Sequence, residues 1–330
     1  MRAGVKPALG AFLLGLGVLL FAASPRPGLV DPPPPVPPVD ADAWLADKVA
    51  ESASIGVSPQ GLERIARATE GRSEVAFLFV HGFGATRGEG EYVVDAVAQD
   101  WDANVYYARL PGHGQDTEAH AAATAEEWLA ASAEALGVAN ALGDRVVVVG
   151  ASTGSAIATW LAATYPDQVH ALILTSPFYD FPEGWTAPLL NSRGGVTLAS
   201  LALGRERDCN LYDPRKQPGY EDHWQTVQMY SILGQLERLR RHCARPEVFA
   251  AVTQPTLMMM HYASYDEHDA VVSIPAMRAA YASFNGGRPH SRSRLVAVRD
   301  GNHVLLSEYV RTDKQAVRMA IDVFLNQVLD

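Results

Sequence analysis

The chain is poor in cysteine and in basic residues, and it contains no internal repeats. Its two cysteines, Cys209 and Cys243, are not part of a Cys/His set with zinc-site spacing. Lysine and arginine number 27 against 37 acidic residues, which gives a formal net charge of −10 without a basic patch. Such a charge disfavours nucleic-acid binding. We therefore expect neither a metal site nor a nucleic-acid partner.

The first residues combine two basic side chains with a long apolar run. Arg2 and Lys6 precede the run from Ala8 to Ala23, in which no side chain is charged or polar. The run is intermediate in length between a signal-peptide core and a membrane-spanning helix, and a poor cleavage site follows it. We expect residues 1–24 to be a signal peptide or an N-terminal membrane anchor, and both alternatives stay open. Either would export the chain, as a membrane-anchored protein facing outward or as a secreted or periplasmic one.

Prolines concentrate after this run, between Asp31 and Pro38. Such a sequence favours a semi-rigid polyproline II spacer, so we expect residues 25–50 to be a Pro-rich linker. About 280 residues remain, enough for one large domain with its own core, at 51–330. In an oxidising compartment Cys209 and Cys243 would be able to form a disulfide, and two unpaired thiols are the alternative.

A serine between two glycines is the most informative local feature, in Gly150-Ala151-Ser152-Thr153-Gly154. The preceding residues 145–149 read as a buried strand, and residues 155–165 read as a helix. Strand, Gly-x-Ser-x-Gly and helix in this order indicate a nucleophile elbow, a strained turn that presents a reactive serine. We expect Ser152 to be the nucleophile. The alternative is an ordinary strand-to-helix turn with a capping serine.

A serine hydroxyl needs a base, and the base needs an orienting acid; behind an elbow the chain order is serine, acid, histidine. His303 follows the strand-like residues 293–298 and precedes helix-like residues 307–329, which is where such a base belongs. We expect it to be the general base; a surface-loop histidine is the alternative.

The acid is expected in the loop after the strand-like residues 254–260. Three carboxylates lie there, on Asp266, Glu267 and Asp269. Asp269 is followed by Ala-Val-Val, so the chain returns to the apolar interior immediately after it. We therefore favour Asp269, with Asp266 second and Glu267 third.

The apolar residues 74–80 read as a central strand that ends in His81-Gly82-Phe83-Gly84. A serine nucleophile needs two backbone N–H groups for the developing oxyanion. We expect these donors to be the amides of Thr153 and Phe83. The Phe83 ring is expected to wall the acyl pocket, and His81 to be a structural hydrogen-bonding residue.

Together these motifs resemble serine hydrolases of the α/β-hydrolase superfamily, close to bacterial carboxylesterases and monoacylglycerol-lipase-like enzymes. The segments that carry the resemblance are His81–Phe83, Leu110–Gly114, Gly150–Gly154, Asp269–Val272 and Gly301–His303. The resemblance implies ester hydrolysis by Ser152, His303 and Asp269 without a cofactor. Many relatives carry a second glycine where this chain has Ser155, which argues against haloperoxidases and C–C hydrolases.

The remaining pattern fits an α/β-hydrolase fold. Helical and strand-like segments alternate, which predicts a mostly parallel sheet with helices on both faces. Thr124 and Glu127 predict a capping box at the start of a helix that ends near 142. The alternation lapses over 178–254, which we read as a helical lid insertion with one helix near 222–241.

The expected activity is hydrolysis of a small ester or lipid through an acyl-enzyme. A lipase, a monoacylglycerol lipase, a thioesterase or an amidase would share the same residues. An envelope acyltransferase and a catalytically silent binding protein are the alternatives from other classes. A membrane would be contacted only through the N-terminal apolar segment.

Overall fold

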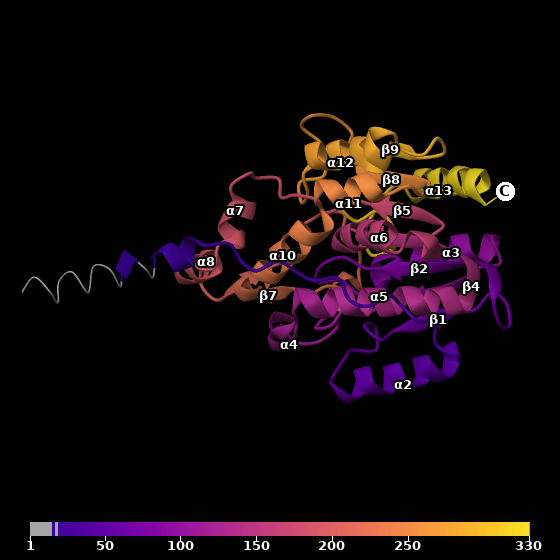
Figure 1. Cartoon of the computed structure of the whole chain (residues 1–330), viewed down its shortest axis with the longest axis horizontal. Coiled ribbons are helices and arrows are strands. Elements are labelled where there is room, and N and C mark those ends of the chain that lie inside the picture. The colour runs from indigo at the N-terminus through magenta and orange to yellow at the C-terminus, as the bar shows by residue number, and fades with distance from the viewer. Residues whose placement is uncertain (1–14, 17–18, 330) are drawn as a thin grey trace, which may run out of the picture.

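The computed structural model describes residues 15–16 and 19–329. Within these residues one sheet has seven strands, in the order β1-β3-β2-β4-β5-β8-β9 (Figure 1). The strands are β1 (Arg64–Ala66), β2 (Ser73–Val80), β3 (Asn104–Tyr107), β4 (Gly143–Ala151), β5 (Ala171–Thr175), β8 (Thr256–His261) and β9 (Arg294–Val298). The edge strand β1 runs antiparallel to β3, whereas all other neighbours in this sheet are parallel.

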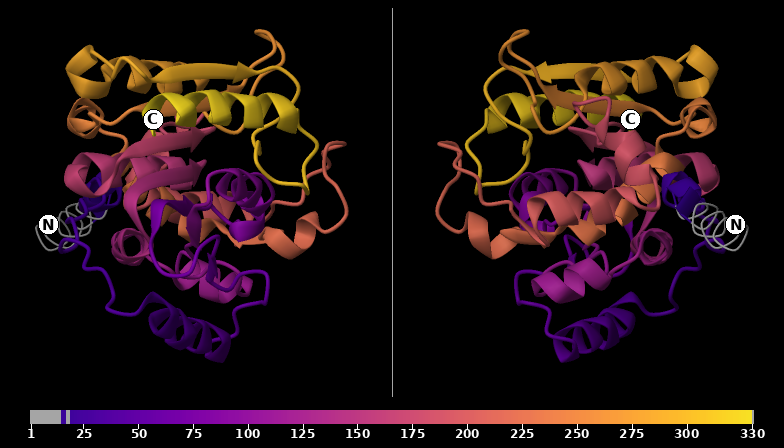
Figure 2. Two further views of the ribbon diagram at one scale, coloured as in Figure 1. Left: turned by 90° about the vertical axis from the view of Figure 1, so that its right-hand side faces the viewer. Right: turned by 90° about the vertical axis from the view of Figure 1, so that its left-hand side faces the viewer.

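Side chains of β2 alternate between two apolar layers, one on each face of the sheet. Ala76 and Leu78 enter the layer that contains α5 (Ala125–Leu142), α6 (Thr153–Thr164) and α12 (Ile274–Gly287). Phe77 and Phe79 enter the layer that contains α3 (Glu91–Asp100) and α13 (Lys314–Val328). This period of two places helices on both faces, as Figure 2 shows. The predicted mostly parallel sheet with helices on both faces is thereby confirmed.

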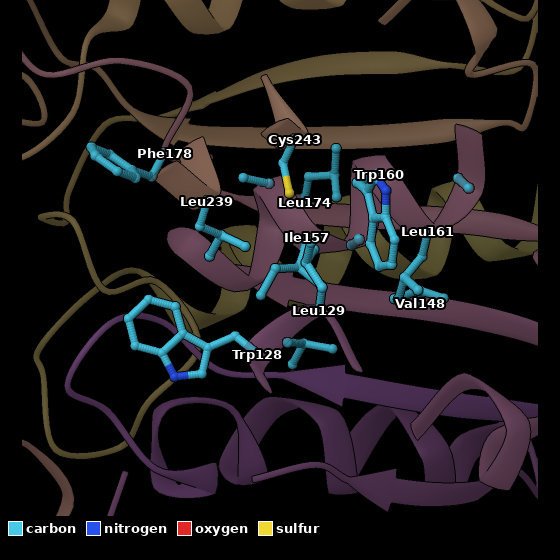
Figure 3. Packing of buried hydrophobic residues seen from close by; sticks show 14 of the residues in the cluster. Trp128, Leu129, Val148, Ile157, Trp160, Leu161, Leu174, Phe178, Leu239 and Cys243 are labelled. Carbon is cyan, nitrogen blue, oxygen red and sulfur yellow. The ribbon is translucent and has the colours of Figure 1, made fainter. Parts of the chain in front are cut away.

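The larger layer joins the sheet to α10 (Leu233–Cys243) through α5 and α6 (Figure 3). Trp128, Ile157 and Leu239 from these three helices are all fully buried there. The Cys243 thiol lies in the same apolar cluster, and burial raises its pKa above the ordinary value. Cys209 and Cys243 are both free, so the disulfide considered from the sequence is not present.

Helix boundaries follow their caps. The predicted capping box forms at α5, where the Glu127 amide donates to Thr124 Oγ1 (3.3 Å) and the Thr124 amide donates to Glu127 Oε2 (2.8 Å). The predicted helix 307–329 begins only at Lys314, because Asp313 is its N-cap. Upstream of that cap, the Tyr309 carbonyl accepts a hydrogen bond from the Gln217 amide, and the Ser307 hydroxyl donates one to Gly88 O.

Residues 178–254, between β5 and β8, hold many short elements. These are α7 (Thr186–Asn191), α8 (Gly195–Leu203), β6 (Glu206–Asp208), α9 (Tyr220–His223), β7 (Val227–Met229), η3 (Tyr230–Ile232), α10 and α11 (Pro246–Ala251). The helix expected over 222–241 was wrong in its first half, because β7 pairs there with β6 as a small antiparallel sheet. Outside this segment, the described residues also form the helices α2 (Ala41–Ser54), α4 (Thr117–Ala122), η1 (Arg87–Glu89) and η2 (Pro166–Gln168).

The structure describes the predicted linker, residues 25–50, but only part of the N-terminal apolar run. Most of the apolar run 8–23 lies outside the described residues. Among the residues that are described, no helix is long and apolar enough to cross a membrane. The stretch predicted as a linker, 25–50, includes most of α2 (Ala41–Ser54), whose N-cap Asp40 accepts hydrogen bonds from two amides of its first turn.

Candidate active site

Ser152 occupies the turn between β4 and α6 with φ 51° and ψ −114°, a strained conformation for a residue with a side chain. Its amide donates to Thr175 O at 2.9 Å. A Cβ at Gly154 would lie 2.0 Å from Val80 O, and one at Gly150 would lie 2.6 Å from Gly154 O. The predicted elbow is therefore formed, and both glycines are required by its close packing.

Ser155, which replaces a second glycine, ties the elbow to β5. Its hydroxyl donates to Gly150 O at 2.7 Å and accepts from the Thr175 amide at 3.0 Å. All three residues are buried. Ser155 thus acts as a hydrogen-bonded brace behind Ser152, a role that the sequence did not indicate.

His303 and Asp269 come together from the loops that follow the adjacent strands β9 and β8. The distance from His303 Nδ1 to Asp269 Oδ2 is 2.8 Å. The other carboxylate oxygen, Asp269 Oδ1, accepts from the amides of Val271 (2.9 Å) and Val272 (3.3 Å). The Asp269 side chain is fully buried, whereas Asp266 and Glu267 are exposed. Of the three carboxylates, only Asp269 reaches the histidine.

The charges of this pair stabilise each other. Burial would raise the pKa of Asp269, but His303 and the Val271 amide hold that pKa below its ordinary value. Burial would lower the pKa of His303, but Asp269, with a smaller contribution from Glu89, holds that pKa above its ordinary value. A carboxylate that accepts from Nδ1 fixes the tautomer in which Nε2 is the free base.

One cavity of about 480 Å³ brings Ser152, Thr153, Phe83 and His303 together. Asp269 lies behind His303 rather than on the cavity wall. The apolar part of the wall includes Phe83, Phe178, Phe181, Leu190, Leu233, Leu236, Val271, Val304 and Val310. Much of it comes from residues 178–254, the segment predicted as a lid. No group of three or more His, Cys, Asp or Glu side chains suited to a metal ion occurs in the described ranges.

The loop after β2 is held in place by hydrogen bonds of the His81 side chain. Buried His81 accepts from the Leu110 amide at Nε2 (3.1 Å), so its Nδ1 donates to Gly82 O (2.9 Å). Burial lowers the His81 pKa to about 4, and the expected structural role is confirmed. Neither the Phe83 nor the Thr153 amide donates a hydrogen bond within the described part of the chain. Both amides are thus free for a ligand at the cavity wall.

Glu89 also borders this cavity, and sequence reasoning missed it. Its side chain is buried, and Oε2 accepts from the Gly82 amide at 2.5 Å. Burial raises the Glu89 pKa to about 7, although the Gly82 bond and His303 act in the opposite direction. A lone carboxylate beside two glycines in a loop gives no sequence signal of burial.

The strand order, the elbow after β4 and the histidine after β9 define the α/β-hydrolase fold. A family model described as alpha/beta hydrolase fold matches residues 75–194. Among solved structures, one of the metagenome-derived lipolytic enzymes LipS and LipT aligns at TM-score 0.66 and 19% identity, covering 82% of this chain and 99% of that one. The Paleococcus ferrophilus monoacylglycerol lipase aligns at TM-score 0.57 and 11% identity, covering 81% and 98%.

Curated relatives give a closer but shorter match. Pimeloyl-[acyl-carrier protein] methyl ester esterases of Neisseria meningitidis serogroup B are 32% identical over 129 residues, 37% of this chain and 46% of theirs. The chain therefore spans about half the length of the curated relatives it matches. The chain thus has the α/β-hydrolase fold and is similar to esterases and monoacylglycerol lipases.

Proposed function

We propose that the chain is a serine hydrolase that cleaves carboxylic esters through an acyl-enzyme. The observation that carries this proposal is the 2.8 Å contact between buried Asp269 and the Nδ1 of His303, which lies on the wall of the cavity that also contains Ser152. A strained serine, an oriented imidazole and two free amides are the parts that acyl transfer requires.

In the proposed reaction, Ser152 Oγ attacks the ester carbonyl carbon while His303 Nε2 takes its proton. The Phe83 and Thr153 amides stabilise the oxyanion, and Asp269 stabilises the imidazolium. The ester C–O bond breaks as His303 returns the proton to the leaving alcohol. Water, activated by the same histidine, then releases the acid and regenerates Ser152.

Covalent labelling tests the nucleophile directly. We expect a fluorophosphonate probe to label the full chain once, and Ser152→Ala to abolish both labelling and ester hydrolysis. Ser283→Ala is the control, because this exposed serine donates only to its own helix at Ala279 O and should label as wild type. Labelling of Ser152→Ala at the wild-type rate would refute the proposal. A wild-type protein that is neither labelled nor able to hydrolyse esters would refute it as well.

We propose short-to-medium acyl esters as the substrate class. A cavity of about 480 Å³ suits a small ligand, and the Neisseria relatives are named for action on a methyl ester. p-Nitrophenyl esters from acetate to palmitate would test chain length, and methyl esters would test the alcohol side. A maximum at palmitate would favour a lipase instead.

Two further proposals concern the rest of the chain. Residues 178–254 act as a lid, which is supported by their large share of the cavity wall. The protein is exported, with the N-terminal segment as anchor or signal; this rests on sequence alone. Cell fractionation of the full chain, followed by N-terminal sequencing, would distinguish an anchored, a processed and a cytoplasmic protein.

A further inference from the structure

Glu89 is held rigidly beside the proposed reaction site. It ends the short helix η1, between Gly88 and Gly90. A Cβ at Gly88 would lie 2.1 Å from His223 Nδ1, and one at Gly90 would lie 2.2 Å from the Phe79 ring. Because both neighbours are glycines, the backbone on either side of Glu89 can pack directly against these two rings. This close packing buries the Glu89 carboxyl group.

The carboxyl group touches the loop that carries the Phe83 amide. Its Oε2 accepts from the Gly82 amide at 2.5 Å. A Cβ at Gly82 would lie 3.1 Å from both carboxyl oxygens and 3.1 Å from Ser152 Cβ. Glu89 and Ser152 therefore both lie against Gly82, and Glu89 also borders the cavity.

Glu89 is also coupled to His303, through charge and through the backbone. The Glu89 charge raises the His303 pKa, and His303 in turn opposes the rise in the Glu89 pKa. Ser307, in the same loop as His303, donates to Gly88 O at 2.7 Å. One carboxylate thus faces both the amide loop and the base.

Other charged or titratable groups near Glu89 are few. The Glu89 charge reaches the phenol of Tyr220, whose pKa is raised chiefly by burial. His223 lies against Gly88, and burial lowers its pKa. On the same segment Arg87 is paired with Glu91 at 2.8 Å. In the described residues, Glu89 itself takes part in no ion pair within 4.0 Å.

We propose that Glu89 is a positioning residue of this site: its carboxylate holds the Gly82 backbone, which immediately precedes the Phe83 amide proposed to bind the oxyanion, and its negative charge stabilises protonated His303 during acyl transfer. This inference rests on the proposed hydrolase function. In its active form the carboxyl is ionised, and no bond to substrate is formed. The residue acts through the backbone amide and through the electrostatic field at the imidazole.

The test compares Glu89→Gln with wild type, using p-nitrophenyl butyrate and the full chain. Glutamine keeps the volume of the side chain and an acceptor for the Gly82 amide, but it removes the charge. If Glu89 only fills space, the variant should therefore keep wild-type activity. We expect kcat to fall about tenfold with KM within about twofold, because the effect appears in the transition state. Glu70→Gln is the matched control: Glu70 is exposed in the segment before β2, at the end of that strand away from Gly82, and it should behave as wild type.

The pH profile separates a positioning role from a structural one. In wild type both Glu89 and His303 must lose protons, so kcat/KM should fall on the acid side more steeply than one ionisation allows. Glu89→Gln should show a single ionisation, displaced to lower pH, because a nearby anion that favoured the imidazolium is gone. The wild-type profile decides the matter even if the variant does not fold.

Two results would overturn the inference: a folded Glu89→Gln with wild-type kcat and an unshifted acid limb, or a wild-type limb that fits one ionisation. Ser152→Ala distinguishes this failure from the failure of the function. Full activity of Ser152→Ala would reject the hydrolase proposal, whereas loss of activity there with unaltered Glu89→Gln would reject only the role of Glu89.

Discussion

The indole Nε1 of Trp160 donates a 2.7 Å hydrogen bond to the carboxylate of Asp31, which joins the proline-rich segment to the helix that begins beside Ser152. His242 Nε2 lies 2.6 Å from the same carboxylate oxygen, and Tyr165 donates to Pro32 O at 2.9 Å. The segment predicted as a spacer is thus attached to the domain by side-chain hydrogen bonds that its composition did not reveal.

Removing this acceptor should loosen the attachment. We expect Asp31→Ala to destabilise the fold by about 1 kcal/mol, or about 2 °C in Tm, since one partly exposed charge-assisted acceptor is lost. Burial would raise the Asp31 pKa, but Trp160 and His242 hold it below the ordinary value. The difference should therefore be present at neutral pH and disappear as pH falls through this lowered pKa. Exposed Asp47→Ala is the control for calorimetry; equal Tm changes in the two variants would contradict the prediction.

The choice of acid in the proposed triad can be tested by comparing two Asp→Asn variants. Asp269→Asn should reduce kcat by about 10⁴-fold, because the imidazole loses both its orientation and the anion that stabilises its charged form. Asp266→Asn, in the same loop but exposed, should remain close to wild type. Steady-state kinetics on one ester would suffice, and the reverse ranking would show that the acid is misplaced.

The acid limb of activity follows from the charge on His303. Its neutral form is the base, and its pKa lies above the ordinary 6.5. Half-maximal kcat/KM should therefore fall above pH 6.5, with activity lost as pH decreases further. In Asp269→Asn the largest raising influence is absent, so the residual activity should persist to lower pH. A wild-type midpoint below 6.5 would contradict this assignment.

The brace behind the elbow predicts an effect on stability. Ser155→Ala leaves the buried Thr175 amide without its acceptor, so we expect a loss of about 2 kcal/mol in the free energy of unfolding. Ser283→Ala is matched, because that exposed serine donates only to its own helix at Ala279 O. Chemical denaturation of both variants would measure the difference, and an equal loss in the two would remove the role given to Ser155.

The sequence alone determined the features that repeat or cap locally. The continuous apolar run of residues 74–80 predicted a central strand, and Thr124 with Glu127 predicted the start of a helix. The strand–turn–helix around Ser152 predicted the elbow because its geometry depends on five consecutive residues. Asp269 was favoured over its neighbours on the apolar pair that follows it, whose amides do bind its carboxylate.

Only the tertiary structure decided which groups meet across long stretches of chain. The pairing of β8 with β9 places Asp269 beside His303, and the packing of Gly88 and Gly90 against distant rings buries Glu89. The late start of α13 depends on bonds from its preceding loop to residues 88, 215 and 217. Such contacts depend on how layers pack, which leaves no periodic signal in the sequence. Burial and neighbouring charges then set the protonation state of these groups. The pKa of a carboxyl group in water differs from its pKa in an apolar wall beside an imidazole.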